Sequence, residues 1–191
     1  VDYVTKPYES EELFARIKGV LNREEGFRDL SMKDGLLGIY NVSYFKKEFA
    51  LLFDIAKRYN QMFSLAVIDM DRFKEINDTY GHLAGDMVLK HFCRVAADQL
   101  RRSDLLMRYG GDEFVIVMPE TNHDQAVQAI EKLKKALVET PVVLDDGRSI
   151  PVNVSVGLVQ YEGVFATPED MFRRADELLY EDKHAKRIPV G

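Results

Sequence analysis

An apolar run near the middle of the chain constrains the fold more than any other feature. Residues 62–70 read Met-Phe-Ser-Leu-Ala-Val-Ile-Asp-Met, so that one serine and one aspartate are the only polar residues in it. The run is far shorter than the ~18 residues that a membrane-spanning helix needs. A nearly continuous apolar segment of this length predicts a strand that is buried on both faces.

Helix and strand signals alternate after this strand and before it. Gly110-Gly111-Asp112 lies between two short apolar runs, which is the pattern of a hairpin. Thr167-Pro168-Glu169-Asp170 combines a cap, a proline at the first helical position and an acid at the third, so it predicts the start of a helix. The remaining expected elements are helices over 43–59, 83–102 and 123–138, strands over 105–109 and 113–118, a turn at 145–147 and a strand containing Val152, Val154 and Val156. Strands mixed with helices in this order predict an α/β (α+β) sandwich with a central, largely antiparallel sheet flanked by helices.

The first part of the chain has a different character. Residues 1–8 are expected to be the end of a strand followed by a turn at Lys6-Pro7, and a helix with one apolar stripe is expected to begin near Ser10. Residues 22–35 are polar and contain glycines, so we expect a linker there.

The overall charge and the cysteine content limit the function classes. The 191 residues carry a formal net charge of −6, which argues against a broad nucleic-acid-binding surface. This charge does not exclude a nucleotide, because a metal ion can mask phosphate charge locally. The single cysteine, Cys93, cannot form an internal disulfide, and we expect no membrane insertion and no export signal in this fragment. These features favour a cytoplasmic location.

Two acidic clusters carry the chemical signal. Asp69-Met70-Asp71 ends the buried strand, and Asp112-Glu113 lies at the tip of the glycine hairpin. Carboxylates at strand ends and hairpin tips can converge, and Mg²⁺ prefers such hard oxygen ligands. Two metals held in this way could activate a hydroxyl nucleophile and stabilise a phosphoryl transition state. The alternative is that these acids are ordinary surface turn residues.

Two other nucleotide or metal motifs are excluded. An EF-hand loop that begins at Asp69 would need glycine at its sixth position, where the chain has Lys74. The chain also contains no Gly-x-x-x-x-Gly-Lys-[Ser/Thr] phosphate loop.

The spacing of the motifs resembles a known family. Arg108-Tyr109-Gly110-Gly111-Asp112-Glu113-Phe114 is similar to the signature from which the GGDEF family takes its name, and the block from Asp69 to Asp86 resembles that family's second hallmark. The resemblance extends from about Asp34 to Arg187. It implies a diguanylate cyclase, which condenses two GTP molecules into cyclic di-GMP plus pyrophosphate, with a core like those of nucleotide cyclases and polymerase palms. An alternative within the family is a catalytically weak domain that binds GTP or cyclic di-GMP as a regulatory module.

The resemblance also implies roles at the catalytic centre. Asp69, Asp112 and the backbone carbonyl of Met70 resemble the metal ligands, and the cofactor would be Mg²⁺ or Mn²⁺. Asp112 resembles the base near the ribose 3′-hydroxyl, Glu113 an acid that helps to hold metal or substrate, and Lys74 the lysine that neutralises the phosphates.

Further residues resemble the family's substrate-binding groups. Asn77 and Asp86 resemble the pair that reads guanine, which suits the donors and acceptors of that base. Lys183 and Arg187 resemble the basic residues that reach the terminal phosphates, although both could simply be cations at a helix C-terminus. Phe73 is a further substrate-binding candidate, with packing in the core as the alternative.

An inhibitory site and a domain boundary complete the comparison with the family. Arg101 and Asp104 resemble an Arg-x-x-Asp site at which the product, cyclic di-GMP, inhibits the enzyme. Residues 1–28 resemble the last strand, Lys-Pro turn and last helix of a response-regulator receiver domain, which leaves 29–191 as the GGDEF domain. The family mechanism implies a homodimer of catalytic domains and a role as output domain of a two-component system. Two segments depart from the family pattern, Leu36–Ser43 and Lys186–Ile188.

Overall fold

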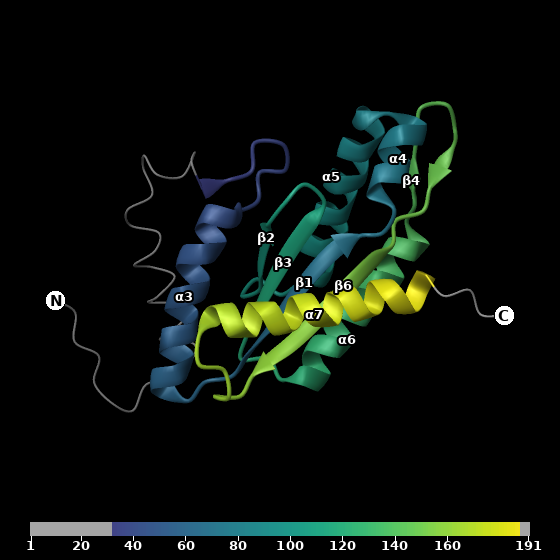
Figure 1. Ribbon diagram of the computed structural model, residues 1–191. Coiled ribbons are helices and arrows are strands. Elements are labelled where there is room, and N and C mark those ends of the chain that lie inside the picture. The colour runs from purple at the N-terminus through teal and green to yellow at the C-terminus, as the bar shows by residue number, and fades with distance from the viewer. Residues whose placement is uncertain (1–31, 188–191) are drawn as a thin grey trace.

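A four-stranded antiparallel sheet forms the centre of the protein. The computed structural model describes residues 32–187, and the sheet has the strand order β2-β3-β1-β6. The strands are β1 (Phe63–Met70), β2 (Leu105–Arg108), β3 (Glu113–Pro119) and β6 (Val154–Tyr161). Strand β1 pairs with β3 on one side and with β6 on the other, as Figure 1 shows. The prediction from the apolar run is therefore confirmed, since seven of the eight residues of β1 are buried.

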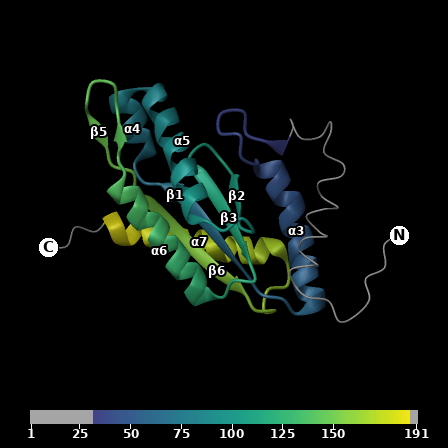
Figure 2. The ribbon, with the colours of Figure 1, turned by 180° about the vertical axis from the view of Figure 1, so that it is seen from behind.

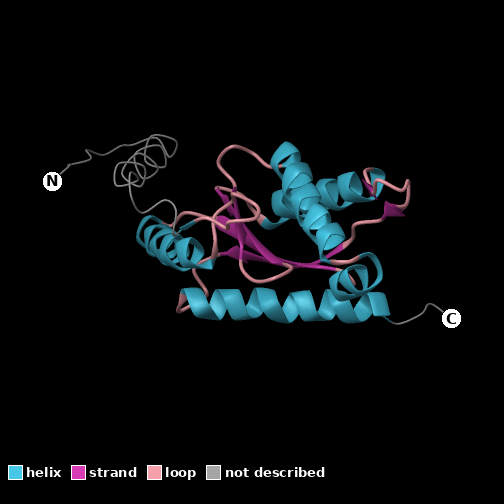
Figure 3. Cartoon of the chain, turned by 90° about the horizontal axis from the view of Figure 1, so that it is seen from above, coloured by secondary structure: helices cyan, strands magenta, loops and turns pink. Residues whose placement is uncertain are grey.

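Helices cover both faces of the sheet. Helices α3 (Val42–Tyr59) and α7 (Pro168–Arg187) pack on one face, over side chains such as Leu65 and Val115. Helices α5 (His82–Gln99) and α6 (His123–Glu139) pack on the other, over Ile68 and Ile116. Figure 2 shows the second face, and Figure 3 shows the sheet between its helical layers. The predicted class, an α/β sandwich with an antiparallel sheet flanked by helices, is confirmed.

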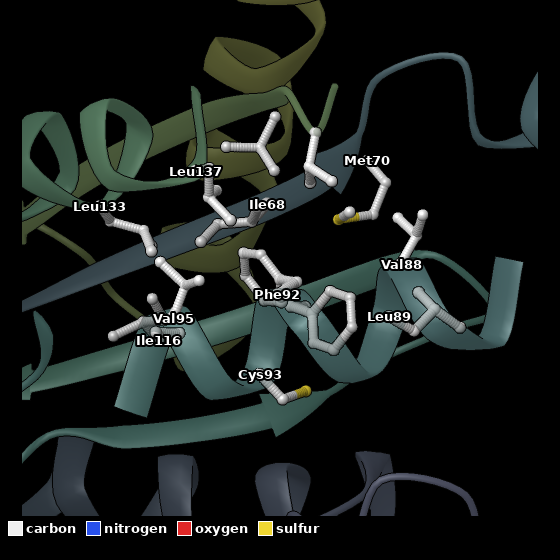
Figure 4. Packing of buried hydrophobic residues seen from close by; sticks show 14 of the residues in the cluster. Ile68, Met70, Val88, Leu89, Phe92, Cys93, Val95, Ile116, Leu133 and Leu137 are labelled. Carbon is white, nitrogen blue, oxygen red and sulfur yellow. The ribbon is translucent and has the colours of Figure 1, made fainter. Parts of the chain in front are cut away.

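The two faces have separate apolar cores. On the α5 side, Phe92 contacts Phe114 with ring centroids 4.4 Å apart. Ile68 lies beside Phe92, and Leu133 belongs to the same buried cluster (Figure 4). On the α3 side, Phe63 and Tyr161 stack with centroids 5.2 Å apart. Burial of apolar surface is the dominant favourable contribution to folding, and large aromatic side chains bury the most of it.

Side-chain caps fix where the helices begin. The Asn41 side chain accepts hydrogen bonds from the N–H groups of Ser43 and Tyr44, and Asn122 and Gln125 form a capping box at the start of α6. At the predicted start of α7, the Thr167 hydroxyl accepts the N–H of Asp170 at 3.1 Å. Such caps satisfy the N–H groups that an α-helix leaves without partners at its start.

One helix, α4 (Phe73–Tyr80), was not predicted from the sequence. It is only two turns long, none of its residues is fully buried, and it begins after Arg72, whose φ of 57° is left-handed. A helix this short has little apolar periodicity to reveal it. It ends at Gly81, whose φ of 86° lets the chain turn directly into α5.

Some predicted boundaries also differ from the structure. The linker expected over 22–35 extends too far, because Lys33 forms a bridge with Tyr40, and Tyr40 forms another with Met107 of β2. The turn at 145–147 joins a small hairpin, β4 (Val142–Val143) and β5 (Ser149–Ile150), so the next long strand begins at Val154 rather than Val152. The predictions for residues 1–28 lie outside the described residues.

Helix α7 approaches the sheet unusually closely. A Cβ atom added to Gly157 of β6 would lie 1.8 Å from the carbonyl oxygen of Ala175 and 2.5 Å from the nitrogen of Leu179. The absence of a side chain at Gly157 therefore allows the helix backbone to lie against the strand. Among residues 32–187, no helix is both long and apolar enough to cross a membrane.

Candidate functional site

The two acidic clusters of the sequence meet at one end of the sheet. Asp69 lies directly opposite Glu113 in the pairing of β1 with β3. The N–H of Met70 donates to the carbonyl oxygen of Asp112 at 3.1 Å, and the N–H of Asp71 donates to Asn153 at 2.9 Å. Antiparallel pairing thus brings Asp69, Asp112 and Glu113 together, although the first two are 43 positions apart in the sequence.

Two lysines of α7 reach this acidic end of the sheet. The Nζ atom of Lys183 lies 2.7 Å from Oδ2 of Asp69, and the Asp69 side chain is only 13% exposed. One turn further along the helix, Nζ of Lys186 lies 3.2 Å from Oδ2 of Asp71. The site is therefore a group of strand-end carboxylates partly neutralised by one helix.

Burial and neighbouring negative charges raise the pKa of two carboxylates at this site. Burial raises the pKa of Asp69, Lys183 opposes the rise, and the neighbouring Asp112 and Asp71 add to it. The pKa of Glu113 is raised by burial and by the charges of Asp69 and Asp112. Carboxylates that repel one another in a partly buried site favour the arrival of a cation or a proton.

The glycine hairpin between β2 and β3 is held rigidly by Arg108. Its guanidinium donates to the carbonyl oxygen of Gly110 at 3.0 Å and to that of Gly111 at 2.6 Å. The same side chain forms an ion pair with Asp34 at 2.9 Å. Burial would raise the pKa of Asp34, but the N–H of Leu37 and the Arg108 guanidinium outweigh it, so the pKa lies below its usual value.

These hydrogen bonds hold the carbonyl groups of Gly110 and Gly111, and thereby position Asp112, which follows them directly. In the sequence, Arg108 stands out only as part of a motif, and nothing there indicates a role for Asp34. The available signal was the place of Arg108 two residues before the paired glycines, since an arginine fork can satisfy several turn carbonyls at once.

The corner between α4 and α5 brings three of the substrate-binding candidates together. The side chains of Asn77 and Phe73 lie against Gly85, where an added Cβ would be 2.1 Å from Asn77 Oδ1 and 3.2 Å from Phe73 Cζ. Asp86 follows Gly85 directly. The side chains of Asn77 and Asp86 form no hydrogen bond with any residue that the structure describes. Their polar groups are thus available at this corner.

Phe73 and the two basic candidates, Lys74 and Arg187, have different surroundings. Phe73 packs against the core on the α5 side, so the core-packing alternative describes its surroundings. Lys74 is exposed in the first turn of α4. Arg187 is the last residue of α7, and its side chain lies outside what the structure describes.

Arg101 and Asp104 form a tight turn between α5 and β2. Oδ2 of Asp104 accepts the N–H of Arg101 at 2.8 Å, and the N–H of Asp104 donates to the Arg101 carbonyl oxygen at 3.0 Å. Burial raises the pKa of Asp104, and its Oδ1 is buried with no hydrogen-bond partner among the described residues. One carboxylate oxygen therefore shapes the turn, while the Arg101 side chain is exposed.

A metal ion at the acidic end would need ligands besides these side chains. Within residues 32–187, no group of three or more His, Cys, Asp or Glu side chains is arranged to hold a metal ion. Mg²⁺ commonly binds through one or two carboxylates, with waters and substrate phosphates as its other ligands. The hard oxygen donors of Asp69 and its neighbours fit that mode of binding.

The fold and the site define a class: a mixed α/β domain in which strand-end carboxylates lie beside two lysines of one helix. The chain belongs to the GGDEF family, because the family model described as "Diguanylate cyclase, GGDEF domain" matches residues 31–188. The match agrees with the motif resemblance found in the sequence.

Named relatives support the assignment. The response regulator PleD of Caulobacter vibrioides is 34% identical over 200 residues, which cover 99% of this chain and 44% of PleD. Diguanylate cyclase A of Treponema denticola is 38% identical over 127 residues, which cover 66% of this chain and 34% of that protein. The solved GGDEF domain of DgcB from Caulobacter crescentus, in complex with c-di-GMP, matches with a TM-score of 0.78 and 26% identity, covering 82% of this chain and 90% of that one. The chain thus spans less than half the length of these two curated relatives.

Proposed function

We propose that the chain is a diguanylate cyclase that condenses two GTP molecules into cyclic di-GMP and pyrophosphate. The observation that carries the proposal is the convergence of Asp69, Asp112 and Glu113 at one sheet end, in a domain of the GGDEF family. Relatives named as diguanylate cyclases support it. In the reaction, the 3′-hydroxyl of each GTP attacks the α-phosphate of the other, and each attack forms one P–O bond and releases pyrophosphate.

The carboxylates have separate roles in this proposal. Asp69, Asp112 and the Met70 carbonyl would hold Mg²⁺ or Mn²⁺, and the bound metal would neutralise charge on the phosphates. Asp112 accepts the proton of the attacking 3′-hydroxyl. Glu113, whose pKa is raised by burial and by Asp69, lies in register with Asp69 and helps to hold metal or substrate.

Basic residues bind the triphosphate. Lys74 is exposed at the start of α4, a helix end that has no side-chain cap and would favour an anion. Lys183 is already at the carboxylates, 2.7 Å from Asp69, and turns to the phosphates when substrate arrives. Arg187 is assigned to the same phosphates from the family resemblance alone.

The α4–α5 corner reads the base. Asp86 accepts the N1 and N2 protons of guanine, and the amide of Asn77 meets another polar edge of the purine. Adenine lacks the N2 amino group and the N1 proton, so ATP would leave Asp86 unpaired. A site built on hydrogen bonds rejects a ligand that cannot complete them.

Turnover requires two domains that face each other, since one domain offers one candidate nucleotide site. We propose a homodimer of catalytic domains, in which a receiver domain brings the partners together. The alignment with a response regulator over 99% of the chain supports the assignment of residues 1–28 to a receiver tail. Linked receivers would raise the effective concentration of one catalytic domain near the other.

A second candidate is a regulatory module that binds cyclic di-GMP. The complex of the DgcB domain with c-di-GMP favours binding of this nucleotide in the family. In this chain the proposed product site is the turn in which the backbone N–H of the exposed Arg101 donates to the Asp104 carboxylate. Product bound there would inhibit the enzyme, so the two candidates share one ligand.

Incubation with GTP and Mg²⁺, followed by mass spectrometry of the products, separates the candidates. The cyclase proposal predicts cyclic di-GMP and pyrophosphate from GTP, no cyclic product from ATP, and specific activity that rises with protein concentration. The regulatory module predicts cyclic di-GMP binding without turnover. Comparable use of ATP, or turnover independent of concentration in a protein that sediments as a monomer, would contradict the proposed mechanism.

A further inference from the structure

Lys186 of α7 makes an unusual number of contacts for a partly exposed lysine. Its ammonium donates to the carbonyl oxygen of Val154 at 2.6 Å, to Oγ of Ser155 at 3.1 Å and to Oδ2 of Asp71 at 3.2 Å. Asp182, one turn earlier on α7, lies 3.4 Å away. An ammonium has three donors, so strand β6 and the chain just after β1 use all of them.

The residues that contact Lys186 form further hydrogen bonds with their own neighbours. The Ser155 hydroxyl donates to Oδ1 of Asp71 at 2.6 Å, so both oxygens of Asp71 are engaged. Oδ2 of Asp182 accepts the N–H of Val156 at 2.9 Å and lies 3.7 Å from Nζ of Lys134 on α6. These contacts join α7, β6, α6 and the end of β1, unlike an isolated surface ion pair that contributes little.

The network lies one helical turn from the candidate catalytic centre. Lys183 precedes Lys186 by three positions, which places both on neighbouring parts of one helix face. Lys183 contacts Asp69, and Lys186 contacts Asp71, two residues later. Helix α7 ends at Arg187, so Lys186 lies in its last turn and Lys183 lies directly before that turn. The end of a helix frays unless contacts hold it in place.

We infer that Lys186 is a positioning residue: it fastens the end of α7 to Asp71 and β6, and thereby presents Lys183 at Asp69. It also supplies a positive charge beside the acidic strand ends. The inference rests on the proposed function in taking GTP as the ligand of this site. The fastening of α7 itself does not depend on that assignment.

The variant Lys186→Met tests both parts, since it keeps the aliphatic stem and removes the charge and the donors. Loss of the charge leaves the strand ends more negative, so Mn²⁺ alone should bind about threefold more tightly. Loss of the fastening frees Lys183, so a non-hydrolysable GTP analogue should bind about fivefold more weakly. A purely structural role would weaken both affinities together.

Two further variants serve as controls, one that conserves the charge of Lys186 and one at an exposed lysine elsewhere. Lys186→Arg keeps the charge and should restore the Mn²⁺ affinity and much of the nucleotide affinity. Lys135→Met, on exposed α6 with an ion pair to Glu139 four positions later, is the matched control and should change neither. Amide hydrogen exchange of residues 180–187 should quicken in Lys186→Met alone.

The measurements are electron paramagnetic resonance titration of Mn²⁺, calorimetry of the nucleotide, and hydrogen exchange. Opposite shifts of the two affinities, with faster exchange in α7, support the inference. Affinities within experimental error of the parent, a parallel loss of both, or unchanged exchange would overturn it. If the parent makes no cyclic di-GMP, the Mn²⁺ and exchange measurements still decide the role of Lys186, so failure of the proposed function is seen separately.

Discussion

Replacement of Gly85 by alanine tests the geometry of the α4–α5 corner. The new Cβ would lie 2.1 Å from Asn77 Oδ1, whereas real Cβ contacts essentially never fall below 3.0 Å. The amide of Asn77 must therefore retreat by about 0.9 Å, the difference between the two distances. Phe73 Cζ, at 3.2 Å, must give only slightly.

We expect Gly85→Ala to leave the stability of the fold nearly unchanged but to weaken nucleotide binding. The end of an asparagine side chain can rotate, and alanine in a helix is favoured over glycine by about 0.8–1.0 kcal/mol. We therefore expect the free energy of unfolding to change by less than ~1 kcal/mol. A hydrogen bond from Asn77 to guanine would be lost, which costs ~0.5–1.5 kcal/mol, or about twofold to thirteenfold in GTP affinity.

A double-mutant cycle isolates this cause. With Asn77→Ala there is no amide to displace, so Gly85→Ala in that background should leave GTP affinity unchanged. The assays are calorimetry with a non-hydrolysable GTP analogue and urea denaturation of all four proteins. Parent-like binding by Gly85→Ala, or the same loss with and without Asn77, would refute the reasoning.

Three further predictions concern the packing and ionisation of residues that support the site. Gly157→Ala should lower the free energy of unfolding by about 2 kcal/mol or more, measured by urea denaturation, because its Cβ meets the Ala175 backbone rather than a flexible side chain; unchanged stability would contradict the close approach. The ion pair of Asp34 with Arg108 adds stability that is present above the ordinary aspartate pKa and lost as pH falls through the lowered folded-state pKa. Asp34→Asn should therefore unfold more easily, by ~1 kcal/mol at neutral pH and by progressively less in acid; a difference that persists at low pH would exclude the ion pair as its cause. Burial raises the pKa of the Cys93 thiol to about 12, so a thiol reagent at pH 8 should label it only after unfolding, and fast labelling of the folded protein would contradict its burial.

The elements that the sequence predicted well have strong local signals. The strand over 62–70 has an apolar run that only a doubly covered position accommodates, and the start of α7 has a cap, a proline and an acid in sequence. Helix α4 was missed because eight residues carry too little periodicity, and its start depends on the left-handed backbone of Arg72. Such a conformation is set by tertiary packing rather than by the residue type.

The site residues also fall into those that sequence motifs indicate and those that only the folded structure brings together. The motifs led to Asp69, Asp112 and Glu113, and the resemblance placed Lys183 on the same centre. The contacts of Lys186 could not be foreseen, because they depend on how closely α7 lies against β6 at Gly157. The ion pair of Asp34 with Arg108 was also missed, since it joins residues 74 positions apart.

The central claim is that strand-end carboxylates from two motifs form one phosphoryl-transfer site. The rate of cyclic di-GMP formation from GTP and Mg²⁺ tests it most directly, compared among the parent, Asp69→Asn and Asp112→Asn, with circular dichroism to confirm folding. The account predicts that each folded variant loses activity by at least about a hundredfold, since metal-held phosphoryl chemistry is worth several kcal/mol. Activity of either folded variant within about threefold of the parent would contradict the account, because that factor corresponds to less than ~1 kcal/mol.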